Sequence, residues 1–368
     1  MSLFSEYVIL NKLIQQRKQV VFYAESRHYY QYFEKLVKDL LENNISICYI
    51  TSDSKDPLLK LQRKNFEVVY VKWMIGFLFS KIKANVMIMT MPDIGNFLFK
   101  RSTGVDTYLY VFHAMVSTHQ QYRKEAFYNY DAIFCIGDYQ EKEIRLAEEL
   151  YHQKRKELIR YGYPLLKKLE GEARVNNQKQ TILIAPSWFD GCIFDTCIDE
   201  LVAQLAIMSY SIIIRSHPEF EKRKRKSFKN IQTLVTKYDN VTFDTTPNVL
   251  DRLPSTDILI TDRSGIALEF AFGIGKPVLF IETVLKQTNK DYKQLGIEPI
   301  ENSLRSEIGI TILPTHLHQL SEKINELNIK SKLGFFEKME TLKNRMLFNN
   351  DDCDKNGLEF ILKKIKEH

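Results

Sequence analysis

The chain has 368 residues, of which 44% are hydrophobic and 27% are charged, and it carries a formal net charge of +6 at pH 7. This length exceeds the roughly 250–300 residues at which a single hydrophobic core stops growing, so we expect two domains. The composition excludes a disordered chain, and the sequence offers no apolar run of about 20 residues for a membrane-spanning helix.

The cysteines and the N-terminus both indicate a cytoplasmic protein. The five cysteines are scattered, without paired metal-ligand spacing or a disulfide framework, as in a reducing compartment. Residues 1–7 lack the features of a signal peptide. Membrane contact would therefore be peripheral. The apolar segment 72–81, with a lysine at each end, is a candidate for that contact, although its pattern also fits a buried helix.

A run of five basic residues at 222–226 carries part of the positive excess. Such a run is typical of a solvated helix face, and it could also attract the headgroups of an anionic membrane surface. No interleaved aromatic residues or nucleic-acid-binding signature accompany it, so we expect no nucleic-acid partner.

Short apolar runs alternate with amphipathic segments along most of the chain, which is the pattern of parallel sheets covered by helices. The candidate strands of the first half are 19–24, 45–51, 66–71, 85–90, 107–112, 132–136 and 158–161. An apolar stripe at helical spacing occupies 29–41, between the first two strands. The first half is therefore predicted to be one doubly wound α/β unit.

A second alternating series follows a polar stretch at 167–180, which we interpret as the interdomain linker. Its candidate strands are 181–185, 210–215, 231–236, 257–261, 277–281 and 308–312. The predicted domains are 1–166 and 181–352. A C-terminal helix within 353–368 is expected to pack back on the first domain.

The polar turn 261–265 lies between a buried strand and a helix-like segment. Backbone N–H groups at the start of such a helix, together with the helix dipole, can hold a phosphate group. We expect Ser264 and Gly265 to make these contacts. Asp262 is expected to cap the following helix or to shape the turn. Arg263 is expected to face either the phosphates or the solvent.

Two histidines follow predicted strands, at the carboxyl ends where open α/β sheets bind ligands. His113 comes after the strand at 107–112, and His217 comes after the strand at 210–215. On opposite domains, they could meet across a cleft. Histidine titrates near neutrality, so it can accept a proton from an attacking hydroxyl or stabilise a phosphate group.

Across residues 105–285 the order of motifs resembles that of the CDP-glycerol glycerophosphotransferases, the teichoic-acid primases and polymerases with a GT-B fold. The matching pieces are Phe112-His113-Ala114, Tyr161-Gly162-Tyr163-Pro164, Ile184-Ala185-Pro186-Ser187-Trp188, Arg215-Ser216-His217-Pro218, the segment 257–265 and Gly275-Lys276-Pro277-Val278. Where the family usually has His-Gly and Asp-Tyr-Ser-Ser, this chain has His113-Ala114 and Asp262-Arg263-Ser264-Gly265.

The resemblance implies two Rossmann-like domains that face each other across a cleft, the first for the acceptor and the second for the nucleotide donor. The implied activity is transfer of glycerol phosphate, or a related polyol phosphate, from a CDP-linked donor to a hydroxyl of a cell-envelope glycan or lipid-linked acceptor. One alternative is a GT-B glycosyltransferase that uses a nucleotide sugar in capsule or lipopolysaccharide synthesis. Another is a non-catalytic protein that binds a nucleotide or a glycan.

By the same resemblance, His113 is the candidate catalytic base and His217 lies near the donor phosphates. Arg215 and Ser216 are donor-site candidates beside it, although an arginine at a strand end often pairs with a local carboxylate. Glu269 is a candidate ribose contact.

The remaining cleft candidates are Pro186, Ser187 and His119, the last expected on a mobile acceptor-side loop. His316 and His318 lack nearby carboxylate partners, and no cluster has convincing metal spacing. Enzymes with the GT-B fold generally work without a catalytic metal. We therefore expect no metal and no cofactor beyond the donor.

Overall fold

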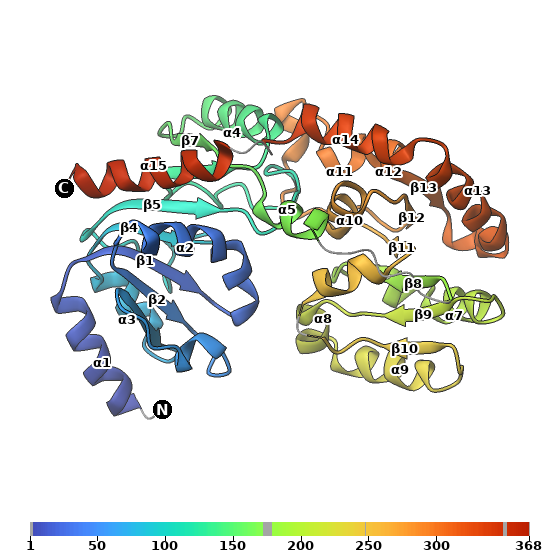
Figure 1. Ribbon diagram of the computed structural model, residues 1–368, viewed down its shortest axis with the longest axis horizontal. Coiled ribbons are helices and arrows are strands. Elements are labelled where there is room, and N and C mark those ends of the chain that lie inside the picture. The colour runs from blue at the N-terminus through green and yellow to red at the C-terminus, as the bar shows by residue number, and fades with distance from the viewer. Residues whose placement is uncertain (1–2, 172–178, 247, 349–351, 368) are drawn as a thin grey trace.

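The first of two parallel sheets is formed by the N-terminal half of the chain (Figure 1). The computed structural model describes residues 3–171, 179–246, 248–348 and 352–367. The first sheet has seven strands in the order β3-β2-β1-β4-β5-β6-β7, all paired in parallel. They are β1 (Lys18–Ala24), β2 (Ile47–Thr51), β3 (Phe66–Tyr70), β4 (Ala84–Met89), β5 (Val105–Val111), β6 (Ala132–Cys135) and β7 (Glu157–Arg160).

The second sheet has six strands in the order β10-β9-β8-β11-β12-β13, again all parallel. They are β8 (Thr181–Ile184), β9 (Ser211–Ile214), β10 (Val241–Phe243), β11 (Ile258–Thr261), β12 (Val278–Ile281) and β13 (Gly309–Ile312). Strand order reverses between β1 and β4 in the first sheet and between β8 and β11 in the second. The predicted α/β class is therefore confirmed.

In the described part of the chain, seven helices and 3-10 turns accompany the first sheet. The first of them, α1, is not predicted from the apolar pattern. They are α1 (Leu3–Gln15), η1 (Arg27–Tyr32), α2 (Glu34–Glu42), η2 (Pro57–Lys60), α3 (Ile75–Lys81), α4 (Asp138–Leu150) and α5 (Pro164–Gly171). Residues 167–171 of the predicted linker are thus the end of a helix, and residues 172–178 of that linker lie outside the described residues.

The helices after β8 include one that replaces a predicted strand. They are α6 (Ile193–Thr196), α7 (Ile198–Ala206), α8 (Pro218–Arg223), α9 (Arg225–Val235), η3 (Val249–Ser255), α10 (Ile266–Ile274), η4 (Tyr292–Leu295), α11 (Ile300–Ser303), α12 (Arg305–Ile308), η5 (Pro314–Gln319), α13 (Leu320–Lys332), α14 (Phe335–Met346) and α15 (Asp352–Lys366). None of the helices in the described ranges is long and apolar enough to cross a membrane.

The strand predicted at 231–236 is wrong, because these residues form the end of α9 and the first residue after it. Ile231 and Leu234 are buried three positions apart, which is helical spacing, and a short apolar run does not distinguish the two structures. The edge strand beside β9 is β10 instead, a three-residue strand too short to leave a periodic pattern.

The basic run at 222–226 is divided between α8 and α9 and does not form one helix face. Lys222 and Arg223 pair with Glu219, and Lys224 pairs with Asp195 at 2.5 Å. Because local carboxylates compensate these charges, the run offers less free positive charge than the sequence suggests.

Helix α15 returns to the first sheet after the chain has completed the second, as Figure 1 shows by its red ribbon beside β7. It contacts α2, β4 and β7. Gly357 packs against Tyr161 so closely that an added Cβ atom would lie 2.5 Å from the tyrosine ring. The C-terminal segment thus covers the first domain.

The two halves also meet through α5 and α10, which are in direct contact. An added Cβ atom on Gly273 would lie 2.8 Å from the Cδ1 atom of Leu169, so the two helices approach closely because position 273 lacks a side chain. One hydrophobic core cluster includes buried residues of both domains at this contact, among them Leu166 and Phe272. This contact fixes α10, whose N-terminus carries the predicted phosphate turn.

Candidate active site

The polar turn at 261–265 lies at the carboxyl end of β11, directly beside the point where strand order reverses in the second sheet. Such reversal points are where open α/β sheets bind their ligands. The neighbouring strand β8 ends just before the candidates Pro186 and Ser187, both of which are buried. The turn at 261–265 and these two residues therefore lie together at the carboxyl edge of the second sheet.

Asp262 anchors this turn, but not as a helix cap. Its carboxylate is fully buried and accepts hydrogen bonds from the backbone N–H groups of Ser187, at 2.8 Å, and Ile193, at 3.1 Å. It also accepts the N–H of Arg263, whereas α10 has no side-chain cap. Of the two roles expected for Asp262, the helix cap is not observed, and the carboxylate shapes the turn by tying it to the loop after β8.

Gly265 brings the N-terminus of α10 against the first domain. An added Cβ atom at this position would lie 3.0 Å from Val116 Cγ1 and 3.5 Å from the Cβ atom of Ala114. Ser264 and Gly265 are both partly accessible. The backbone groups that were predicted to hold a phosphate thus lie next to the segment that carries His113.

His113 follows β5 and is enclosed by aromatic rings of the first domain. Its ring centroid is 5.4 Å from that of Tyr29 and 6.1 Å from that of Tyr32, both in edge-on arrangements. Its Nδ1 atom is buried without a hydrogen-bond partner. Burial, with a contribution from the charge of Lys286, lowers the pKa of His113 to about 4. The imidazole is therefore neutral at pH 7 and able to accept a proton.

His217 precedes α8 and acts as its N-cap. Its Nδ1 atom accepts a hydrogen bond from the N–H of Glu219 at 3.1 Å, so the neutral ring carries its proton on Nε2. The side chain is exposed, and partial burial of the ring, with the charges of Lys286 and His113, lowers its pKa below the ordinary range. The two predicted histidines thus lie within electrostatic reach of each other.

Arg215 and Ser216, the other candidates after β9, are both engaged by neighbouring side chains. The guanidinium of Arg215 pairs with Asp244 at 2.6 Å and also donates to Thr246. The hydroxyl of Ser216 donates to Glu221 at 2.6 Å. The local carboxylate pairing, one of the two alternatives for Arg215, is the one observed.

Arg263 is not directed into solvent, which was one of its two expected orientations. It pairs with Glu282 and donates to Asn302 at 3.2 Å. Arg305 pairs with the same glutamate and donates to the carbonyl oxygen of Asp262 at 2.8 Å. Arg263 therefore belongs to a largely buried ion-pair group behind the turn.

Glu269 is buried and faces the first domain, so the structure does not support the predicted ribose contact. Its carboxylate accepts a hydrogen bond from the hydroxyl of Tyr163, which also lies 3.4 Å from the carbonyl oxygen of His113. Burial raises the pKa of Glu269 to about 7, although the bond from Tyr163 opposes this shift. The residue links α10 to the segment after β7.

His119 is buried at the junction between the domains, so its predicted place on a mobile loop is wrong. Its Nδ1 atom lies 3.3 Å from Glu143, and its Nε2 atom lies 3.1 Å from the carbonyl oxygen of Ile297 in the second domain. Burial opposes charge on His119, but the bond and charge of Glu143 and the carbonyl of Ile297 together raise its pKa. His119 joins the domains.

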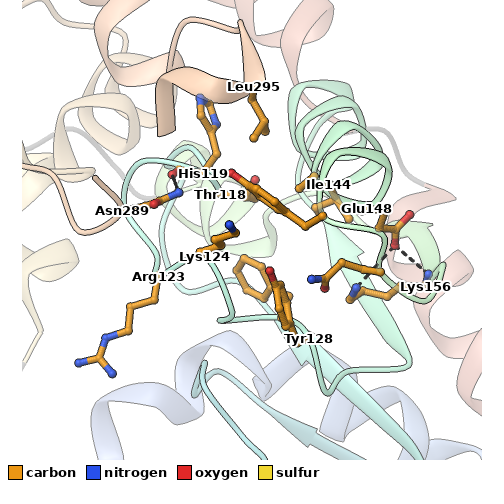
Figure 2. Close-up of a pocket in the computed structure, with 14 residues that line it drawn as sticks. Thr118, His119, Arg123, Lys124, Tyr128, Ile144, Glu148, Lys156, Asn289 and Leu295 are labelled. Carbon is orange, nitrogen blue, oxygen red and sulfur yellow. Dashed lines mark hydrogen bonds and ion pairs between the residues drawn. The ribbon is translucent and has the colours of Figure 1, made fainter. Parts of the chain in front are cut away.

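A small pocket lies on the side of this junction formed by α4 and the loop before it. Its volume is about 40 Å³, too small for a nucleotide. Figure 2 shows His119 beside Asn289 at one side of the pocket and Glu148 beside Lys156 at the other. This pocket is not the predicted donor site, which lies at the carboxyl ends of β8 and β11.

Lys286 is a residue of the site that the sequence reasoning missed. It lies after β12, and its charge lowers the pKa of both His113 and His217. The charges of Asp262 and Glu301 act on it in turn. The only sequence signal was its position in a polar loop after a strand, which many lysines share. Within the described ranges, no three His, Cys, Asp or Glu side chains come together as a metal-binding group.

Solved structures of transferases share the overall fold over almost the whole chain. A variant of the wall teichoic acid polymerase TagF matches with a TM-score of 0.63 and 15% identity, over 99% of this chain and 98% of that chain. The glycotransferase of kitacinnamycin gives 0.55 and 10%, over 95% and 99%. A glycosyltransferase from Rickettsia africae gives 0.52 and 10%, over 96% and 100%. The two facing sheets form a GT-B fold, as predicted.

A comparison of the sequence with models of protein families identifies the family. The model of the CDP-glycerol:poly(glycerophosphate) glycerophosphotransferase family matches residues 6–294, well over half of the chain. The chain belongs to this family, and the protein is a transferase. Comparison with the curated proteins found no significant match.

The buried Glu269 predicts a pH-dependent stability. The folded protein keeps this carboxyl protonated up to about pH 7, whereas the unfolded chain releases the proton near 4.5. Folding stability is therefore lost as the pH rises between these values, by roughly 2–3 kcal/mol. We expect Glu269→Gln to remove this loss, so that the variant gains stability relative to wild type at pH 8 compared with pH 4.5.

Urea unfolding at both pH values measures this difference. Glu337→Gln, which alters an exposed glutamate of α14, is the matched control and should show no such gain. An equal effect of Glu269→Gln at both pH values would show that the pKa of Glu269 is the same in the folded and unfolded chains.

Proposed function

We propose that the protein transfers glycerol phosphate, or a related polyol phosphate, from a CDP-linked donor to a hydroxyl of a cell-envelope glycan or lipid-linked acceptor. One observation carries the proposal: in a member of this family, the N-terminus of α10 is packed against the segment that bears His113. The turn that we expect to bind phosphate and the segment with the neutral imidazole thus come together from different domains. One TagF structure was obtained after a 30 minute soak with CDPG, which is consistent with such a donor.

The donor diphosphate would bind at the start of α10. The backbone N–H groups of Ser264 and Gly265 and the helix dipole supply positive potential there. His217 offers its Nε2–H group as a further donor, since its Nδ1 atom is occupied by Glu219. These groups would stabilise the charge that develops on the leaving nucleotide.

His113 would act as the general base. The acceptor hydroxyl oxygen attacks the phosphorus that carries the glycerol, and its proton passes to His113. The bond between that phosphorus and the bridging oxygen breaks, and its electron pair leaves with CMP. The low pKa of His113 keeps it unprotonated before binding, and a neighbouring diphosphate raises that pKa, which makes it a better base in the complex.

The acceptor would approach from the first domain. Tyr29, Tyr30 and Tyr32 follow β1, and two of these rings surround His113. Aromatic faces pack well against the C–H groups of sugars and polyols while hydroxyls remain solvated. A glycan end placed there would present its hydroxyl to His113.

Donor screening tests this proposal. We expect CDP-glycerol to raise the melting temperature and to yield CMP when an acceptor extract is added, with glycerol phosphate incorporated into the acceptor. Mass spectrometry identifies the products. Stabilisation and transfer with a nucleotide sugar, but not with CDP-glycerol, would contradict the proposal and favour a glycosyltransferase.

The same assay tests His113. His113→Ala should lower the turnover number by about 10²- to 10⁴-fold, because proton removal from the acceptor is lost. Donor affinity should change little. His318→Ala removes an exposed histidine of the second domain and should leave both quantities unchanged. Full turnover by His113→Ala would exclude it as the base.

We also propose that the first domain touches a membrane surface, through what we call the apolar face. This face comprises exposed side chains on neighbouring segments: α1, α3 with the residues just before it, and the loop that contacts Gly76. Its members are Leu3, Phe4, Tyr7, Val8, Trp73, Phe77, Phe97 and Leu98.

Two large aromatic side chains of this face are strongly exposed: Trp73 is 68% exposed and Phe97 is 92% exposed. The ammonium groups of Lys72 and Lys100 lie over their rings, which suits an anionic membrane.

Vesicle sedimentation tests this contact. Replacing both Trp73 and Phe97 by serine should weaken binding to vesicles of equal parts phosphatidylglycerol and phosphatidylcholine by about tenfold, because apolar area is lost. The control replaces Ile207 and Leu333, which are exposed on the second domain, by serine. Equal binding by both double variants would show that the apolar face is not the contact surface.

A further inference from the structure

The segment that carries Lys286 is held on both sides of the lysine. Before it, Val284 packs over Gly191, where an added Cβ atom would lie 2.7 Å from the valine Cγ2 atom. After it, the N–H of Thr288 donates to the carbonyl oxygen of Gln120 at 3.0 Å, and Asn289 donates to the carbonyl oxygen of His119. The segment thus spans from the second domain to the first, and Lys286 lies at the junction.

The ammonium group of Lys286 has neither a hydrogen bond nor an ion pair within the part of the chain that the structure describes. The neighbouring arginines differ in this respect, because Arg263 and Arg305 share Glu282 and Arg215 is paired with Asp244. Lys286 is half-buried. A partly desolvated charge without a partner is unfavourable, so an anion that bound beside it would remove this cost.

The groups within electrostatic reach of Lys286 are those of the candidate active site. They include His113 of the first domain and His217 and Asp262 of the second. Burial lowers the pKa of Lys286, while Asp262 and Glu301 oppose this shift. Both histidines are neutral at pH 7. The carboxylates of Asp262 and Glu301 act on the lysine through their charge, but neither is paired with it among the described residues: Asp262 accepts backbone N–H groups, and Glu301 accepts the N–H and hydroxyl of Ser117.

We infer that Lys286 binds the diphosphate of the donor, at the phosphate that leaves with the nucleoside. The assignment rests on the proposed function, and it adds a side-chain cation to the backbone groups at the start of α10. When the bond from the glycerol-bearing phosphorus to the bridging oxygen breaks, the electron pair moves to the CMP oxygen. The ammonium group compensates this charge, while the proton of the acceptor goes to His113.

Isothermal titration of CDP-glycerol, CMP and cytidine into the full chain tests the inference. Lys286→Ala should weaken the binding of CDP-glycerol and CMP by about 10- to 100-fold and leave cytidine unaffected, because only the phosphates meet the lysine. Lys286→Arg should retain most of the affinity. Lys290→Ala removes an exposed lysine of the same segment and should behave as wild type.

Thermal unfolding without ligand separates phosphate binding from a structural role. Removing an unpaired, partly desolvated cation should leave the melting temperature of Lys286→Ala equal to or above that of wild type, while the increase caused by CDP-glycerol shrinks. A lower melting temperature or a failure to fold would assign Lys286 a structural role and overturn the inference.

The titrations also distinguish failure of this inference from failure of the proposed function. Wild-type affinity of Lys286→Ala for CDP-glycerol and CMP would overturn the role of Lys286 and leave the donor assignment intact. Absence of CDP-glycerol binding to wild type would overturn both.

Discussion

The carboxylate of Glu301 accepts hydrogen bonds from both the N–H and the hydroxyl of Ser117, and the rest of the site depends on this tie. It joins α11 of the second domain to the turn that begins with His113. His119 and Asn289 add bonds across the same junction. Because buried polar groups are costly to leave unpaired, these contacts hold the carboxyl ends of the two sheets in one relative position. The imidazole of His113 and the N-terminus of α10 can then act on one substrate.

Small residues allow the two domains to approach each other closely at this junction. Gly265 packs against Val116 and Ala114, and Gly273 packs against Leu169. The family usually has glycine at 114, in the first domain, and serine at 265, in the second. In this chain the glycine is at 265 and the larger residue, alanine, is at 114. The departures at 114 and 265 thus occur at one interdomain contact, where side chains from both domains share limited space, whereas Arg263 pairs with Glu282 behind the turn.

The features that depend on local sequence patterns, namely the strands and the residues at their ends, could be predicted from the sequence. Apolar runs located most strands, and their ends located His113, His217 and the turn at 261–265. The sequence could not predict pairings between distant segments: Arg263 meets Glu282, Glu269 meets Tyr163, and Asp262 holds the loop after β8. Lys286 is functional only through its three-dimensional neighbours, which no spacing reveals. The apolar run at 231–236 fits a strand and a helix equally well, and only packing decides between them.

In this account the two domains divide the reaction: the second holds the nucleotide and its phosphates, and the first supplies the base and the acceptor. A crystal structure of His113→Ala with CDP-glycerol tests this division most directly. The account predicts the diphosphate between the N-terminus of α10, Lys286 and His217, with the glycerol-bearing phosphorus facing position 113. A nucleotide bound elsewhere, or a diphosphate turned away from position 113, would contradict it.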